Sequence, residues 1–123
     1  MTNVLTLPSV SGSYTIANDA DWRTAWTFPP TGTAIDITGI AFHLQMRPVA
    51  GSTEIDLDLS TAGGALTNGG TSGVLSLIAP LAMLQEIPPG AYVADLVATA
   101  DGATINLCAG APLAITVVEG VTW

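Results

Sequence analysis

Apolar and polar residues alternate with a period of two along several short stretches of this 123-residue chain. The clearest alternation covers residues 40–47, where every second residue is large and apolar (Ile40, Phe42, Leu44 and Met46). Because successive side chains of a strand point to opposite faces, this pattern predicts a strand with one face in the core and one in water. Similar patterns predict strands at residues 13–16, 22–28, 54–59, 74–78, 91–100, 103–108 and 113–118.

Proline and glycine separate these stretches. A Pro-Pro pair ends the strand at 22–28, because proline cannot continue a central strand. Residues 60–73 contain five glycines and predict a loop or a hairpin tip. The one segment with helical character is 80–87, which begins at Pro80, a residue suited to the first helical position, and stops before Pro88.

The stretch at 87–102 joins the helical segment to the C-terminal strands. A Pro-Pro-Gly turn precedes its strand, and an Asp-Gly turn follows it. Neither face of this strand is purely polar, so we predict that it lies at the centre of its sheet or is covered on both faces, one candidate cover being another subunit. The two faces are Tyr92, Ala94, Leu96 and Ala98 on one side and Val93, Asp95 and Val97 on the other.

These elements predict an all-β fold, an antiparallel immunoglobulin-like β-sandwich of about seven to eight strands with one short helix. The chain shows no alternation of strands with helices, and its length suits a single domain. We expect an extended N-terminal arm at 1–12, the sandwich at 13–118 and a C-terminal tail at 119–123. One strand face is expected to form an aromatic part of the core: Trp22, Thr24, Trp26 and Phe28.

Charge is scarce and almost entirely negative. Ten carboxylates, two arginines and no lysine give a formal net charge of −8 at pH 7. Nucleic-acid binding requires a basic stripe, and anionic membranes attract basic segments, so neither kind of partner is expected. No apolar run approaches the roughly 18 residues that span a bilayer, and the N-terminus lacks the basic region of a signal peptide. We therefore expect synthesis in the cytoplasm without a cleaved signal.

Candidate chemistry is sparse. Glu54, Asp56 and Asp58 fall on one face of a predicted strand, but at that spacing at most two could reach one calcium ion, and a solvated strand face explains them better. The only histidine, His43, shares a strand face with polar residues, which favours a surface position. The single Cys108 cannot form an intrachain disulfide and lies among apolar residues. No catalytic motif is present, so we predict no enzymatic activity, cofactor or bound metal.

Two features predict association with other subunits. Natural sheets often protect exposed edges with lysine, which this chain lacks, so assembly would cover edges that are otherwise prone to pairing. The N-terminal arm is either a frayed terminus or a segment that docks on a neighbour, and the terminal Trp123 lies either in solvent or against another chain. We expect a homo-oligomer, with an interface that includes Val4, Leu5, Leu7 and Trp123.

The order of several short motifs resembles a known family. They are an aromatic strand at 21–28, Ile-Asp-Ile-Thr-Gly at 35–39 before the long strand at 41–47, a helix-turn-strand at 81–84 and 89–97, and final strands that end in Cys108-Ala109-Gly110 and at 113–117. Over about residues 13–118 the chain is similar to small β-sandwich virion proteins of tailed bacteriophages and prophage-like particles. The pattern resembles that of the N-terminal domain of phage baseplate upper proteins. No catalytic residue is implied.

The resemblance implies a structural virion protein, an adaptor or decoration subunit of the tail, baseplate or fibre region. It would be located in the virion and assemble with copies of itself and with other virion proteins. No coiled coil or receptor-carrier domain follows within these 123 residues, as it does in baseplate upper proteins, so we expect an adaptor rather than a receptor binder. The alternative is a carbohydrate- or host-surface-binding β-sandwich module. Exposed Trp or Tyr in a concave patch would favour that alternative, and buried aromatic residues would favour assembly.

Overall fold

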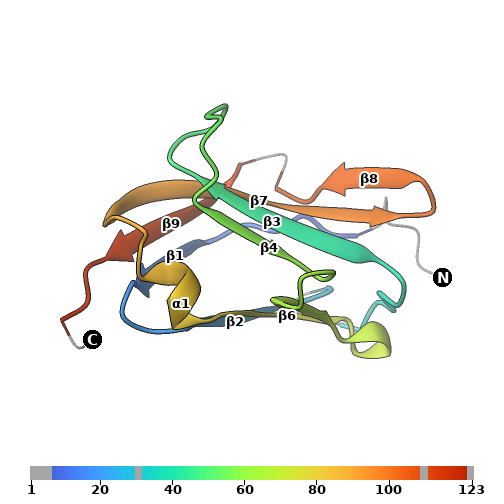
Figure 1. Ribbon diagram of the computed structural model, residues 1–123. Helices are drawn as coiled ribbons and strands as arrows, with labels where there is room; N and C mark the ends of the chain where they lie inside the picture. Colours follow the sequence, from blue (N-terminus) through green and yellow to red (C-terminus); the bar gives the residue numbers. More distant parts are fainter. Residues whose placement is uncertain (1–6, 30–31, 109–110, 122–123) are drawn as a thin grey trace.

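The computed structural model of the chain describes residues 7–29, 32–108 and 111–121, and its strands form two packed sheets (Figure 1). The larger sheet has the strand order β1-β9-β7-β3-β4, with β8 also pairing with β7, and the smaller sheet has the order β2-β6-β5. This architecture confirms the predicted all-β sandwich. The elements are β1 (Ser13–Ala17), β2 (Trp22–Thr27), β3 (Ala41–Arg47), β4 (Leu57–Ser60), β5 (Leu66–Asn68), η2 (Gly70–Ser72), β6 (Val74–Ala79), α1 (Leu81–Leu84), β7 (Gly90–Ala100), β8 (Ala103–Asn106) and β9 (Leu113–Val118).

One strand pair of the described chain is parallel. β1 runs beside β9 in the same direction, with Ser13 opposite Ala114 and Ala17 opposite Val118. This pair departs from the antiparallel pairing that we expected throughout, because alternation along a strand is the same whichever way its neighbour runs. The first strand thus lies beside the last, and a β2-β6-β5 sheet faces the sheet built around β7, as in immunoglobulin-like sandwiches.

The core lies between the sheets and consists of the apolar face of each strand. Leu44 and Met46 of β3 are fully buried, as the alternation predicted. Phe42 stacks on Phe28 of the other layer, with ring centroids 5.9 Å apart. The predicted aromatic face of the second strand is also in the core, since Trp22, Trp26 and Phe28 are at most 8% exposed.

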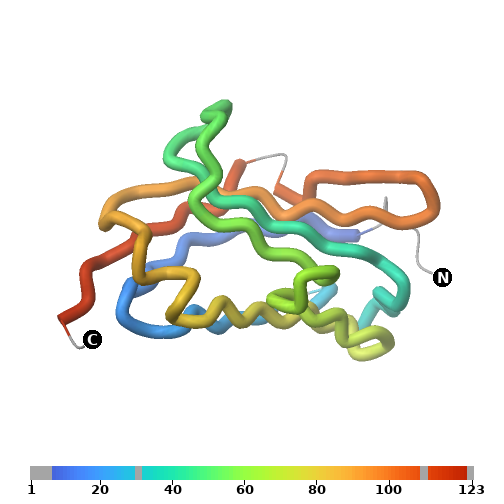
Figure 2. Tube along the Cα trace, viewed as in Figure 1, coloured from blue at the N-terminus to red at the C-terminus, as the bar shows by residue number. Residues whose placement is uncertain are grey.

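A short turn connects α1 to β7 (Figure 2). The hydroxyl of Tyr92, near the start of β7, donates to the carbonyl oxygen of Pro88 at 2.6 Å. Such a tyrosine corner is a recurrent feature of immunoglobulin-like sandwiches at this connection. β7 has β3 on one side and β9 on the other, which confirms its predicted central place in the sheet.

Three boundaries differ from the prediction. α1 comprises only Leu81–Leu84, a single turn. β4 begins at Leu57 and not at residue 54, because the preceding residues belong to a loop that projects from the sandwich (Figure 1). The glycine-rich segment 60–73 contains the strand β5, whose three residues are too few to show a period.

The segment before β1 is part of the sandwich as far as the structure describes it. Leu7 and Val10 are both 7% exposed and belong to the core. The backbone N–H of Val10 donates to Leu107 at 2.8 Å, which ties this segment to the larger sheet. The assignment of Leu7 to a subunit interface is therefore corrected, because its own core already buries it. The other predicted interface residues, Val4, Leu5 and Trp123, lie outside the described residues.

Candidate interaction surface

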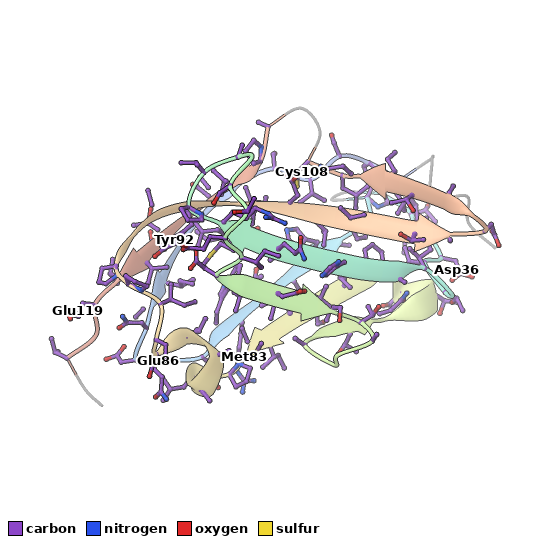
Figure 3. The ribbon with its side chains drawn as sticks, turned by 45° about the horizontal axis from the view of Figure 1, so that its top comes forward. Asp36, Met83, Glu86, Tyr92, Cys108 and Glu119 are labelled. Atoms are coloured by element: carbon purple, nitrogen blue, oxygen red, sulfur yellow. The ribbon has the colours of Figure 1, made fainter. Side chains whose placement is uncertain are left out.

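An open pocket of about 380 Å³ lies on the outer face of the larger sheet, over β3 and β7. Its floor is formed by outward side chains of these two strands, and its sides by the β3–β4 loop and the β8–β9 connection, where Cys108 lies (Figure 3). We call it the β3–β7 pocket. Its described lining residues are His43, Gln45, Arg47, Ala50, Gly51, Val93, Ala94, Asp95, Val97, Asn106, Cys108 and Pro112.

The strand register places charges of both signs on the floor of the pocket. Gln45 of β3 lies opposite Asp95 of β7, and Arg47 lies opposite Val93. Arg47 and Asp95 are therefore diagonal neighbours, which in an antiparallel pair lie about 7–8 Å apart. Both residues are half-buried.

Arg47 holds the loop side of the pocket in place. Its Nη1 donates to the carbonyl oxygen of Ser52 at 2.6 Å, and its Nη2 donates to Oε1 of Gln45 at 3.0 Å. Gln45 in turn donates to Asp58 at 3.3 Å, and the other carboxylate oxygen of Asp58 contacts Nε2 of His43. A continuous polar network thus runs from the β3–β4 loop across β3 to β4.

A second network holds the opposite side. Nδ2 of Asn106 donates to Asp95 at 3.0 Å, and the backbone N–H of Cys108 donates to Oδ1 of Asn106 at 2.8 Å. Because both ends of the Asn106 amide are bonded, its orientation is fixed. Both sides of the pocket are therefore held by side chains that rise from its floor, which makes the pocket preformed.

The two floor charges have no ion-pair partner within the described chain. Between described residues, an ion pair joins Arg23 to Asp21 at 3.4 Å, and the imidazole of His43 contacts the carboxylate of Asp58. Arg47 donates to neutral oxygens, and Asp95 accepts from a neutral amide. The pocket therefore presents one positive and one negative group whose charges are not neutralised locally.

Next to the pocket, and sharing Val93 with it, the outer face of the larger sheet carries no charged side chain over β1, β9 and the start of β7. Its members are small or β-branched, and all are exposed or half-buried. Such a surface costs little to desolvate, because no ion has to leave water. We call it the neutral face, and it consists of Ser13, Thr15, Ala17, Ala91, Val93, Ala114, Thr116 and Val118.

The three carboxylates of the 54–58 region do not act as one row. Glu54 and Asp56 precede β4, whereas Asp58 lies on it. A hydrogen bond with Asp56 and the charge of that neighbour raise the pKa of Glu54, while Asp58 contacts His43. Within residues 7–29, 32–108 and 111–121, no group of three or more His, Cys, Asp or Glu side chains is placed to hold a metal ion.

His43 and Cys108 both line the β3–β7 pocket, although they are far apart in sequence and no spacing signal linked them. The imidazole of His43 contacts Asp58 on β4, away from the thiol. Cys108 is buried, and burial raises the pKa of its thiol. A buried thiol with a raised pKa stays protonated, whereas an activated nucleophile needs an accessible thiolate.

Among the described aromatic residues, Trp22, Trp26 and Tyr92 lie in the core, and Tyr14 is half-buried and packs against it. Trp22, Trp26 and Tyr92 are 5%, 8% and 8% exposed, and no aromatic side chain is among the described residues that line the β3–β7 pocket. A second cleft of about 320 Å³ lies between residues 8–11 and β2, and Trp26 borders it with little exposed surface. A stacking platform for a sugar ring is therefore not provided by these side chains.

In the described parts of the chain, no helix has the length and apolar character needed to cross a membrane. No family model and no curated protein matches the sequence. Among solved structures, the chain is similar to a Drosophila protein structure described as OTK, extracellular domains 3-5, at 15% identity and a TM-score of 0.35. The match covers 93% of this chain and 39% of the other, so the chain spans about two-fifths of that structure's length.

Proposed function

We propose that this chain is a structural subunit of a phage or phage-like particle, located in the virion. It would serve as an adaptor or decoration protein of the tail, baseplate or fibre region, and act by assembling with copies of itself and with other virion proteins. The order of motifs over about residues 13–118, which resembles the N-terminal domain of phage baseplate upper proteins, supports this role.

The observation that carries the proposal is the neutral face. A standard protein interface buries about 800 Å² of each partner, and the described chain exposes 6370 Å². An interface of that size would occupy about one-eighth of this surface. Interface cores are depleted of charged residues, and here a continuous strip across β1, β9 and β7 is free of them.

Open strand edges add to this support. β1 pairs only with β9 among the described strands, and β4 pairs only with β3, so each leaves one backbone edge unpaired. An unprotected edge is a template for pairing with another chain. The alternative role, recognition of carbohydrate, is less well supported because the described tryptophans are buried.

The test is whether the protein is a constituent of particles. Particles released from cells that encode the chain are purified on a density gradient, and their proteins are identified by mass spectrometry. We expect this chain to co-sediment in fixed proportion with other virion proteins, and to remain after a high-salt wash. Its absence from the particle fraction, with the protein recovered only as free chain, would refute the proposal.

A further inference from the structure

We propose that the β3–β7 pocket receives Arg23 of a second copy of this chain, with Asp95 as the acceptor of its guanidinium and Asp21 of the incoming copy facing Arg47. This inference rests on the proposed assembly function and specifies which surfaces meet. It converts a general tendency to associate into one defined head-to-tail contact.

The receptor side is preformed and carries two unpaired charges. Arg47 is held by Ser52 and Gln45, and Asp95 is held by Asn106, so neither side chain must be reordered on binding. A ligand with a single positive charge would be repelled by Arg47, and a ligand with a single negative charge would be repelled by Asp95. A group that carries both signs side by side satisfies both.

The same chain offers such a group on its other face. Arg23 and Asp21 form an ion pair at 3.4 Å, and their side chains are 67% and 40% exposed. Asp21 is also fixed from behind, because the backbone N–H of Leu81 donates to its Oδ1 at 2.8 Å. Ile78, directly opposite Arg23 on β6, is 43% exposed and would supply an apolar flank.

The scarcity of basic residues also favours Arg23 as the group that binds Asp95. The sequence contains two arginines and no lysine. Arg47 lines the pocket itself, where Ser52 and Gln45 hold its guanidinium, so the exposed Arg23 is the arginine that a second copy offers more readily to Asp95. Arginine suits this contact because its guanidinium can bond a carboxylate through two parallel N–H groups. On the pocket floor, Val93 and Val97 would pack against the apolar part of the incoming side chain.

The geometry of the two patches determines the kind of assembly. Arg23 lies on β2 in the smaller sheet, whereas the pocket opens over β3 and β7 on the outer face of the larger sheet. Figure 1 shows β2 in the layer opposite β3 and β7. Different surfaces of the two copies therefore meet, which is a heterologous contact. Repetition of such a contact gives a ring when the rotation closes and a filament when it does not.

The experiment is a charge swap, read by sedimentation velocity over a concentration series. Arg23→Asp and Asp95→Arg should each weaken self-association by about tenfold or more, since each places like charges together at the contact. An equimolar mixture of the two variants should recover association to within about threefold of the wild type, because each contact in the mixed assembly again joins opposite charges. Asp101→Arg, the same change at the β7–β8 turn and outside both patches, is the matched control and should leave association unchanged.

Circular dichroism spectra confirm that each variant is folded. Arg23 is so exposed that its replacement leaves the core untouched, which keeps the test valid even if Asp95→Arg does not fold. A wild-type chain that stays monomeric, or one that associates equally with and without Arg23, would overturn the proposed contact. Neither result would decide whether the protein is a virion constituent, because the particle analysis tests that separately.

Discussion

The hydroxyl of Tyr92 offers the sharpest test of how the connection from α1 to β7 is held. It donates to the carbonyl oxygen of Pro88 at 2.6 Å, and the ring itself is 8% exposed. Tyr92→Phe removes this one hydrogen bond and keeps the ring in the core. The substitution therefore separates the hydrogen bond from the packing of the ring.

The expected loss of stability is about 1 kcal/mol, the net value of a typical intramolecular hydrogen bond. Because Pro88 is exposed, water can replace the lost donor, and the larger penalty of a buried unpaired carbonyl does not apply. For a domain of this size the midpoint of thermal unfolding should fall by about 4 °C. Tyr92→Ala also removes the buried ring and should cost about 3 kcal/mol or more.

The same hydroxyl gives a pH signature. Burial, followed by the charges of Asp56 and Glu54, raises the pKa of Tyr92 above its ordinary value of 10.0. The folded state therefore holds the phenolic proton more tightly than the unfolded state does. The corresponding stability is fully present below about pH 10 and is lost as the pH rises through the folded-state pKa. Phenylalanine has no such proton, so the difference between wild type and Tyr92→Phe should narrow above pH 10.

Urea unfolding followed by tryptophan fluorescence measures both effects, since Trp22 and Trp26 lie in the core. The free energy of unfolding is compared for wild type, Tyr92→Phe and Tyr92→Ala at pH 7, and for the first two again above pH 10. A Tyr92→Phe variant within about 0.3 kcal/mol of wild type at pH 7 would refute the role given to the hydrogen bond. A difference that stays constant above pH 10 would refute the raised pKa.

Three further substitutions test other parts of the fold. Gly73→Ala should destabilise the protein by roughly 1–3 kcal/mol more than Gly102→Ala. The two glycines have similar φ values, +70° for Gly73 and +77° for Gly102. A Cβ at Gly73 would lie 2.7 Å from a backbone oxygen, whereas one at Gly102 would have no other atom within 4 Å. Equal melting temperatures of the two variants would contradict this expectation. Asn18→Ala should cost about 1–3 kcal/mol in urea unfolding, because the buried amide is bonded at both ends to distant backbone groups, and a cost below about 0.5 kcal/mol would count against that role. Glu54→Gln should raise the melting temperature at pH 7 but not at pH 3.5. The raised pKa of Glu54 beside Asp56 means that the ionised carboxylate is less favourable in the folded state than in the unfolded state. A higher melting temperature at both pH values would contradict this cause.

Strands with a clear period of two could be predicted from the sequence almost to the residue. β3 and β7 begin and end within one residue of the predicted bounds, since alternation and flanking proline or glycine both mark them. β5 could not be found, because three residues carry no period and its pairing with β6 depends on the rest of the sheet. The parallel pairing of β1 with β9 could not be predicted either, since the sequence of a strand does not determine which strand it pairs with.

The β3–β7 pocket could not be predicted either, because it also depends on how the strands pair. Arg47 was correctly placed on the polar face of its strand, and Asp95 was grouped with Val93 and Val97 on one face of the central strand, the face that lines the pocket. Arg47 and Asp95 are diagonal neighbours because Gln45 lies opposite Asp95 in the pairing of β3 with β7. The sequences of these two strands do not determine that register by themselves. The sides of the pocket come from two loops that alternation does not describe.

The parallel pairing of β1 with β9 also has a consequence for synthesis. Among the described strands β1 is synthesised first and its partner β9 last, so β1 must remain unpaired until β9 has left the ribosome. Closing a loop of that length delays the pairing further, because contacts between distant segments form late. A nascent chain that stops before β9 should therefore leave the region of β1 open to proteolysis. The synthesis of β9 is therefore the step after which β1 can join the larger sheet.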